Sequence, residues 1–228
     1  MFRCTVMTGR MNCEGNMDRD WVIRCISILD CRLGRSARYA SLFEPTPAFY
    51  AGLAEGDADA LQSAAQAIAV WLGLGNCPAV SYEWGLFMAP TAAGDYRCAP
   101  VGRSAIRVPI ASAGFPLALG AILAHELSHE ILARNAIAPA SIDELELLTD
   151  LTSIHQGLGK LVLNGTVARE VLPLGDWRFF LGYLAPDLKA FAFRLIAARC
   201  GLKEQDLLGN LCPEGVAVLG EEGRATAY

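Results

Sequence analysis

Five consecutive residues, His125-Glu126-Leu127-Ser128-His129, have the types and spacing of the HExxH motif of zinc hydrolases. Residues four apart share one face of a helix, so the imidazoles of His125 and His129 can reach a single metal ion. Glu126 follows the first histidine, and from there its carboxylate can take a proton from water that the metal activates. The chain has only three histidines, and two of them fall in this motif. The pattern therefore predicts a Zn²⁺ site with Glu126 as the catalytic base. The alternative is a pair of surface histidines that form ion pairs with Glu126 and Glu130.

A catalytic zinc ion usually takes three ligands from the protein, so a third ligand must follow the motif. The extended pattern HExxHxxGxxH is absent, because this chain has Leu132 and Asn135 where glycine and histidine would stand. Glu146, on the next predicted helix, is the predicted third ligand. Asp150 lies one turn later on the same face, where it can accept a hydrogen bond from a ligand imidazole. Two alternatives stay open: Asp150 as the ligand itself, and a solvated acidic face that binds no metal.

The elements that position these residues follow from apolar periodicity and capping signals. A helix is predicted at residues 116–134, and a second helix opens at Ser141, whose capping partner is Glu144. Further helices are predicted at residues 21–33, 57–74 and 186–200. Residues 80–84, 96–99 and 104–110 are predicted to form a small antiparallel meander, and a parallel sheet is not expected because strands and helices do not alternate. The last of these strands is predicted to pair with an extended peptide.

Composition and charge restrict the class of protein. Hydrophobic residues make up 53% of the chain, which is enough for a large core. The net charge of −5 and the pI near 5.2 argue against a nucleic-acid partner. The uncharged run at residues 108–124 contains Pro109, Gly114 and Pro116, so no membrane span is expected. No secretory signal is visible, which predicts a cytoplasmic protein whose eight cysteines are reduced and buried.

The motif and Glu146-Leu147-Leu148-Thr149-Asp150 together resemble the gluzincin type of zincin metallopeptidases, in which HExxH is followed on a later helix by ExxxD. The chain is also similar to a family of uncharacterised bacterial HExxH proteins over roughly residues 40–200. The similarity is carried by residues 45–49, 122–127, 147–151, 157–159 and 182–184.

This resemblance implies an α+β, zincin-like fold, in which a small antiparallel sheet packs on the active-site helix beside further helices. The expected divisions are an N-terminal extension at 1–40 with one short helix, a metal-dependent hydrolase domain at 41–205, and a C-terminal tail at 206–228. From Pro213 onward, the glycines and the weak periodicity predict a loop or disordered segment. Tyr183, within the similar segment 182–184, is a candidate substrate-binding residue. His155 is a second candidate, for a substrate oxyanion, although an apolar residue is expected there in the family. The alternative for His155 is a core histidine with satisfied hydrogen bonds.

The expected function is zinc-dependent hydrolysis of peptide bonds in a peptide or protein substrate. Two alternatives remain at this stage. One is a zinc-binding regulatory or interaction protein without turnover, and the other is hydrolysis of an amide that is not a peptide. Glu126 favours an enzyme, because a purely structural zinc site does not need a general base.

Overall fold

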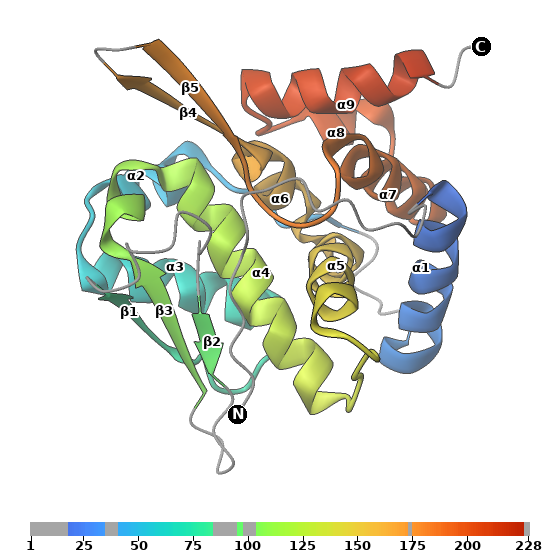
Figure 1. Ribbon diagram of the computed structural model, residues 1–228, viewed down its shortest axis with the longest axis horizontal. Helices are drawn as coiled ribbons and strands as arrows, with labels where there is room; N and C mark the ends of the chain where they lie inside the picture. The colour runs from blue at the N-terminus through green and yellow to red at the C-terminus, as the bar shows by residue number, and fades with distance from the viewer. Residues whose placement is uncertain (1–17, 35–40, 84–94, 98–103, 173–174, 226–228) are drawn as a thin grey trace.

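Two helices, α4 (Pro116–Arg134) and α5 (Ile142–Ser153), lie side by side at the centre of the computed structural model (Figure 1). The structure describes residues 18–34, 41–83, 95–97, 104–172 and 175–225. A three-stranded sheet and α3 lie on one side of this pair, and α1 and α7 lie on the other. The remaining helices are α1 (Arg19–Leu33), α2 (Pro47–Ala54), α3 (Ala58–Trp71), α6 (Gly159–Thr166), α7 (Pro186–Arg199), α8 (Glu204–Leu208) and α9 (Pro213–Ala225).

The two central helices begin where their sequence signals predict. Pro116 occupies the first turn of α4, where its missing N–H group is not needed. The Ser141 side chain accepts a hydrogen bond from the Glu144 backbone at 3.1 Å and so caps α5. The Glu144 carboxylate accepts a bond from the Ala140 backbone, one residue earlier than in an ideal capping box. The predicted helices at 116–134 and after Ser141 are therefore confirmed.

One of the two strand pairings in the predicted antiparallel meander is wrong. The strands β1 (Ala79–Glu83), β2 (Asp95–Arg97) and β3 (Ala105–Pro109) have the order β1-β3-β2. β3 pairs antiparallel with β2 but parallel with β1, so the sheet is mixed. Residues 84–104 separate the parallel pair, which is long enough for the crossover that a parallel connection needs. Since β3 has a hydrogen-bonded strand on each side, the prediction that it adds an extended peptide is also wrong.

A second sheet, which the sequence analysis missed, is the hairpin of β4 (Val167–Leu172) and β5 (Gly175–Phe180). Figure 1 shows the hairpin projecting from the helical body. The chain returns from it at Leu181, whose backbone N–H donates to the Thr166 carbonyl at 3.0 Å. The residues that follow, from Gly182 to Leu184, are thereby brought back to the centre of the molecule.

The segment from Pro213 onward differs from the expectation of a loop or disordered tail. It forms α9, which packs against α6 and α7 through the buried side chains of Val218 and Leu219. Its several glycines lower helix propensity, and tertiary packing overrides this weak preference. The helix α1 at the other end of the chain also packs against α7. The domain divisions at residues 40 and 205 stay a prediction.

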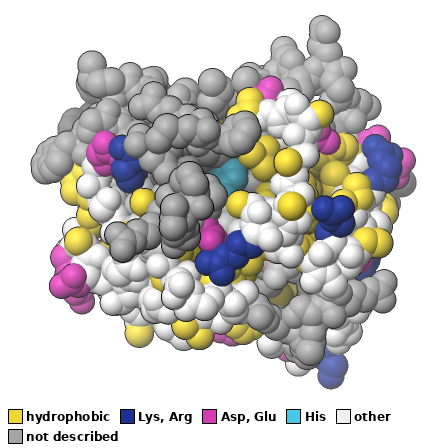
Figure 2. All heavy atoms as spheres, turned by 90° about the horizontal axis from the view of Figure 1, so that it is seen from below, with side chains coloured by type: hydrophobic (Ala, Val, Ile, Leu, Met, Phe, Trp, Pro, Cys, Tyr) yellow, Lys and Arg dark blue, Asp and Glu magenta, His cyan; other side chains and the backbone are white. Residues whose placement is uncertain are grey.

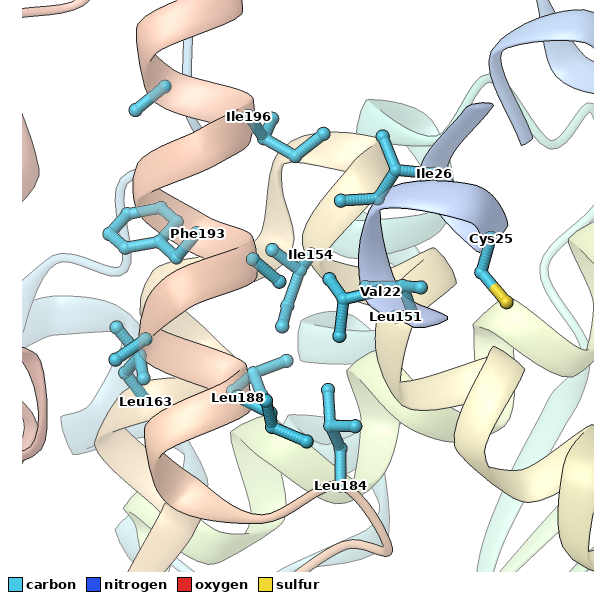
Figure 3. Packing of buried hydrophobic residues seen from close by; sticks show 14 of the residues in the cluster. Val22, Cys25, Ile26, Leu151, Ile154, Leu163, Leu184, Leu188, Phe193 and Ile196 are labelled. Carbon is cyan, nitrogen blue, oxygen red and sulfur yellow. The ribbon is translucent and has the colours of Figure 1, made fainter. Parts of the chain in front are cut away.

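The core consists of two apolar clusters that meet at α4 and α6. One joins α3, α4 and the three-stranded sheet, and the other joins α1, α5, α7 and α9. Figure 3 shows the second cluster, where Val22 and Ile26 of α1 lie close to Leu151 and Ile154. Burial of each such side chain contributes about 1.5–3 kcal/mol relative to leaving it exposed. This packing holds α5 firmly against its neighbours.

A kink at Gly157 allows α5 and α6 to contact α4 although they follow one another in the chain. The helix continues from α5 through a π-helical turn, Ile154–Leu158, in which Gly157 has a φ of 85°. Only glycine adopts this backbone conformation without strain. The carbonyl groups that the kink releases are bonded, because Phe43 N–H donates to Gly157 O at 3.0 Å and Trp71 Nε1 donates to Gln156 O at 2.9 Å.

Candidate metal centre

Three side chains from the two central helices converge at one point. The Nε2 atom of His125 lies 3.0 Å from Glu146 Oε2 and 3.2 Å from His129 Nε2. The third side of the triangle, from His129 Nε2 to Glu146 Oε2, is 3.5 Å long. The three residues are 5%, 4% and 2% exposed for His125, His129 and Glu146, respectively. The structure thus brings together the three residues that the sequence predicted as ligands.

The size of this triangle fits a small divalent cation. Zinc binds imidazole nitrogen at about 2.0–2.1 Å and carboxylate oxygen at about 2.0–2.2 Å, so two ligand atoms of a tetrahedral site lie about 3.3 Å apart. The three measured separations, from 3.0 to 3.5 Å, lie around that value. A buried His-His-Glu group of this size could therefore hold a metal ion.

The hydrogen bonds behind the two imidazoles direct their lone pairs toward this point. His125 Nδ1 donates to the Asp150 carboxylate at 2.8 Å, which leaves Nε2 as the lone-pair atom. The Thr149 hydroxyl donates its proton to Leu145 O at 2.7 Å, so it accepts from His129 Nδ1, 3.2 Å away. All three atoms that face one another are consequently electron-pair donors, and a bound cation satisfies them together.

Electrostatics at the cluster favour the protonation states that metal ligation requires. Burial alone would raise the pKa of Glu146, but the adjacent imidazoles of His125 and His129 lower it to about 2. Burial lowers the pKa of His129, although the neighbouring carboxylate of Glu146 opposes this change. The glutamate is therefore ionised and His129 neutral near pH 7, as a metal site needs.

Asp150 supports the cluster from behind and does not face the other two ligands. Its Oδ1 accepts from His125, and its Oδ2 accepts from the backbone N–H groups of Tyr183 at 2.7 Å and Leu184 at 2.8 Å. Burial raises the pKa of Asp150, but the nearby ammonium group of Lys189 and the bond to His125 bring it well below its ordinary value. Asp150 thus stands where a carboxylate fixes the tautomer of a ligand imidazole.

Glu126 is completely buried on α4, directly after His125. The next acidic residue of the helix, Glu130, accepts hydrogen bonds from Ser104 and Arg134, each at 2.6 Å. The alternative of two surface histidines that pair with Glu126 and Glu130 is therefore wrong, since neither His125 nor His129 lies on the surface as an exposed side chain.

The two candidate substrate-binding residues have different positions. The Tyr183 ring stacks on the His125 ring, with centroids 5.9 Å apart and an angle of 25° between the planes. His155 is not brought to the cluster; its Nε2 lies 3.1 Å from Asp30 Oδ1 on α1, and its Nδ1 accepts from Gln156. His155 therefore occupies the core position that the sequence analysis gave as its alternative.

Three residues of the centre were missed by the sequence analysis: Thr149, Gly182 and Lys189. Thr149 had a usable signal, because it lies three residues after Glu146 and so shares the ligand face of α5. Gly182 and Lys189 contact Asp150 from distant parts of the chain. Gly182 lies in the segment 182–184 that carries the resemblance, but nothing in that segment assigns it to the site, and no local pattern marks Lys189.

One part of the centre reaches the surface. Figure 2 shows a histidine side chain on one face of the molecule, with acidic and basic side chains close by. His125 and His129 are 5% and 4% exposed, whereas His155 has no exposed area. A narrow cleft is lined by His125 and Asp150 together with Ala121, Ile122 and Lys189. The cleft therefore reaches the centre on the side of His125 and Asp150.

Two further expectations concern the whole chain. Among the residues that the structure describes, none of the helices is long and apolar enough to cross a membrane. The described cysteines, 25, 31, 77, 200 and 212, are all free thiols. Cys31 is exposed, so the expectation that all the cysteines are buried is wrong. Cys4, Cys13 and Cys98 lie outside the described residues.

Comparison with known proteins does not place the chain in a family. No protein-family model, curated protein or solved structure matches it. The metal cluster therefore stands on its own geometry, and the zincin fold remains a proposal.

A pH dependence of stability follows from the buried position of His155. Burial lowers the pKa of His155 from its ordinary value of 6.5, although Asp30 raises it. The unfolded chain then binds the proton more readily, so this contribution to stability is complete above about pH 6.5 and is lost as the pH falls below it. Urea unfolding at pH 7.5 and 5.5 should show a smaller loss of stability for His155→Gln than for wild type. Equal losses in the two proteins would contradict this assignment.

Proposed function

We propose that this protein is a zinc-dependent hydrolase of the zincin type that cleaves peptide bonds. The observation that carries the proposal is the triangle of His125 Nε2, His129 Nε2 and Glu146 Oε2, whose sides match the edges of a tetrahedral zinc site. Three protein ligands leave one coordination position for a reacting group, which is typical of catalytic zinc sites.

A bound zinc ion supplies a Lewis acid that acidifies water and polarises a carbonyl group. Glu126 adjoins the first ligand and serves as the general base, which takes a proton from the attacking water at its carboxylate. The same carboxylate then donates this proton to the leaving amine. Asp150 and Thr149 keep the Nδ1 protons of the two imidazoles in place, and so keep both Nε2 lone pairs directed at the ion.

The surface around His125 supports a substrate with an apolar group beside the scissile bond. The cleft next to this ring is lined mainly by aliphatic side chains, from α4, Val162 and Leu181, and also by Asp150 and Lys189. The Tyr183 ring stacks on the imidazole. A substrate that reaches the metal from this side would contact Tyr183. An amide that is not part of a peptide would undergo the same chemistry.

A second candidate, zinc binding without turnover, is favoured by the near-complete burial of all three ligands. Structural zinc sites are enclosed, whereas catalytic sites keep an open position. The carboxylate of Glu126 beside the first ligand favours the enzyme. The two candidates differ in one measurable property, which is whether small anions such as azide alter the spectrum of the cobalt-substituted protein. Only an open coordination position gives this change.

The proposal predicts about one zinc ion per chain. Protein purified without contact with a nickel column should contain close to one equivalent, because the site offers three preorganised ligands in suitable protonation states. Elemental analysis by plasma mass spectrometry gives the stoichiometry. Less than about a tenth of an equivalent of any transition metal would contradict the proposal, since a catalytic site of this kind should be mostly filled.

A further inference from the structure

A lysine ammonium group is buried directly behind the metal cluster. Lys189, in the first turn of α7, is 2% exposed, and its Nζ lies 3.7 Å from Asp150 Oδ2. The same Nζ donates a hydrogen bond to the carbonyl oxygen of Leu181. Burial of an ammonium group is unfavourable unless a negative charge and hydrogen bonds compensate for it. In this protein the compensating charge is the carboxylate of Asp150, which also accepts the hydrogen bond from His125.

The loop before α7 is shaped to allow this contact. Gly182 has a φ of 86°, and a Cβ atom there would lie 2.4 Å from Lys189 Nζ and 2.6 Å from Asp150 Oδ2. Any side chain at this position would separate the two charged groups. The next two backbone N–H groups of the loop, from Tyr183 and Leu184, donate to Asp150 Oδ2. Lys189 therefore holds the loop through Leu181 and neutralises the carboxylate to which the loop binds.

We propose that Lys189 is a positioning residue of the metal site, which acts through Asp150 to orient His125. With Oδ2 held by Lys189 and by the loop, Oδ1 is left to accept from His125 Nδ1, and Nε2 is directed at the metal. The charges agree with this role, because Glu146 and Asp150 carry two negative charges and Lys189 one positive charge. The ammonium group of Lys189 thus offsets the charge of Asp150. The inference rests on the proposed metal site but not on the proposed hydrolysis.

The first test is zinc affinity, measured by competition with a chromogenic chelator. Lys189→Met keeps the length of the stem and removes the charge, and should weaken zinc binding about 10–100-fold, as expected for loss of an outer partner of a ligand. Lys160→Met is the matched control. Lys160 is also a buried lysine, 1% exposed and bonded to Glu44 at 2.6 Å, and its loss should lower stability without a change in zinc affinity.

A double-mutant cycle with Asp150→Asn separates positioning from a general structural role. If Lys189 acts through Asp150, Lys189→Met should have little further effect on zinc affinity in the Asp150→Asn background. Equal effects in both backgrounds, or an unchanged affinity in the single variant, would overturn the inference. If Lys189→Met does not fold, Lys189→Gln takes its place, because glutamine retains a donor for Leu181 and removes the charge. Equal effects in both backgrounds, or an unchanged affinity, would again overturn the inference.

A measurement on metal-free protein keeps this inference distinct from the proposed function. Nitrogen-15 NMR of the three imidazoles should show His125 in the Nδ1–H tautomer in wild type and in Lys160→Met. In Lys189→Met that preference should be reduced. An unchanged tautomer would contradict the role of Lys189 even if the protein binds zinc. A protein that binds no zinc but shows this tautomer change would instead contradict the proposed function.

Discussion

Replacement of Glu126 with glutamine should lower turnover at least about 100-fold, the lower end of the effect of a general base. Glutamine keeps the size of the side chain and removes the carboxylate that accepts the proton. Zinc content and Tm should change little, because Glu126 supplies none of the three ligand atoms around the metal position. Activity is measured first on a diverse peptide library, and then by mass spectrometry of cleavage products in a host protein extract.

The matched control for this variant is Glu130→Gln, the same substitution one helical turn later on α4. Glu130 is buried as well, but it bonds to Ser104 and Arg134 rather than contributing to the cluster. This variant should lose some stability and retain turnover. Identical cleavage products at identical rates from wild type and Glu126→Gln would show that the activity arises elsewhere. Zinc binding without cleavage by either protein would favour the non-catalytic candidate.

The helices that carry the site could be predicted because their signals are local. Pro116 marks the first turn of α4, and Ser141 with Glu144 marks the start of α5, so the spacing between His129 and Glu146 could be read as two adjacent helices. Helical periodicity then placed Glu146 and Asp150 on one face. These inferences depend on interactions within one turn of helix, which the sequence contains directly.

The parts that were not predicted depend on contacts between distant segments. Alternation of apolar residues marks β1 and β3 as strands but does not determine whether they run parallel. In the sequence Lys189 looks like an ordinary surface lysine near the start of a helix, and only packing against Asp150 shows its burial. The glycines of α9 lower its local helix propensity, and its helical state depends on contact with α7. His155 could not be assigned for the same reason, because its partner Asp30 lies on α1.

The sequence also left open whether Glu146 or Asp150 is the third ligand, and the structure gives the two carboxylates different environments. Glu146 Oε2 faces both Nε2 atoms, whereas both oxygens of Asp150 are already engaged, one by His125 Nδ1 and the other by backbone N–H groups. To reach the Nε2 atoms, Asp150 would have to turn away from His125 Nδ1, which would leave a buried donor without its partner. Glu146 is therefore the better ligand.

Glu146→Ala should accordingly lose most of the bound zinc, since it removes one of three ligands and leaves two imidazoles whose Nε2 atoms lie 3.2 Å apart. Asp150→Asn should retain zinc with about 10–100-fold weaker affinity, because the amide can still accept from His125 but no longer carries the charge. Asp143→Ala, in the first turn of the same helix, is the control that should bind zinc as wild type does. All four proteins are compared by chelator competition and by metal content after dialysis. If Asp150→Asn lost the metal and Glu146→Ala kept it, the third ligand would be Asp150. The contact of Glu146 Oε2 with the two Nε2 atoms would then be a hydrogen-bonded contact and not part of the metal site.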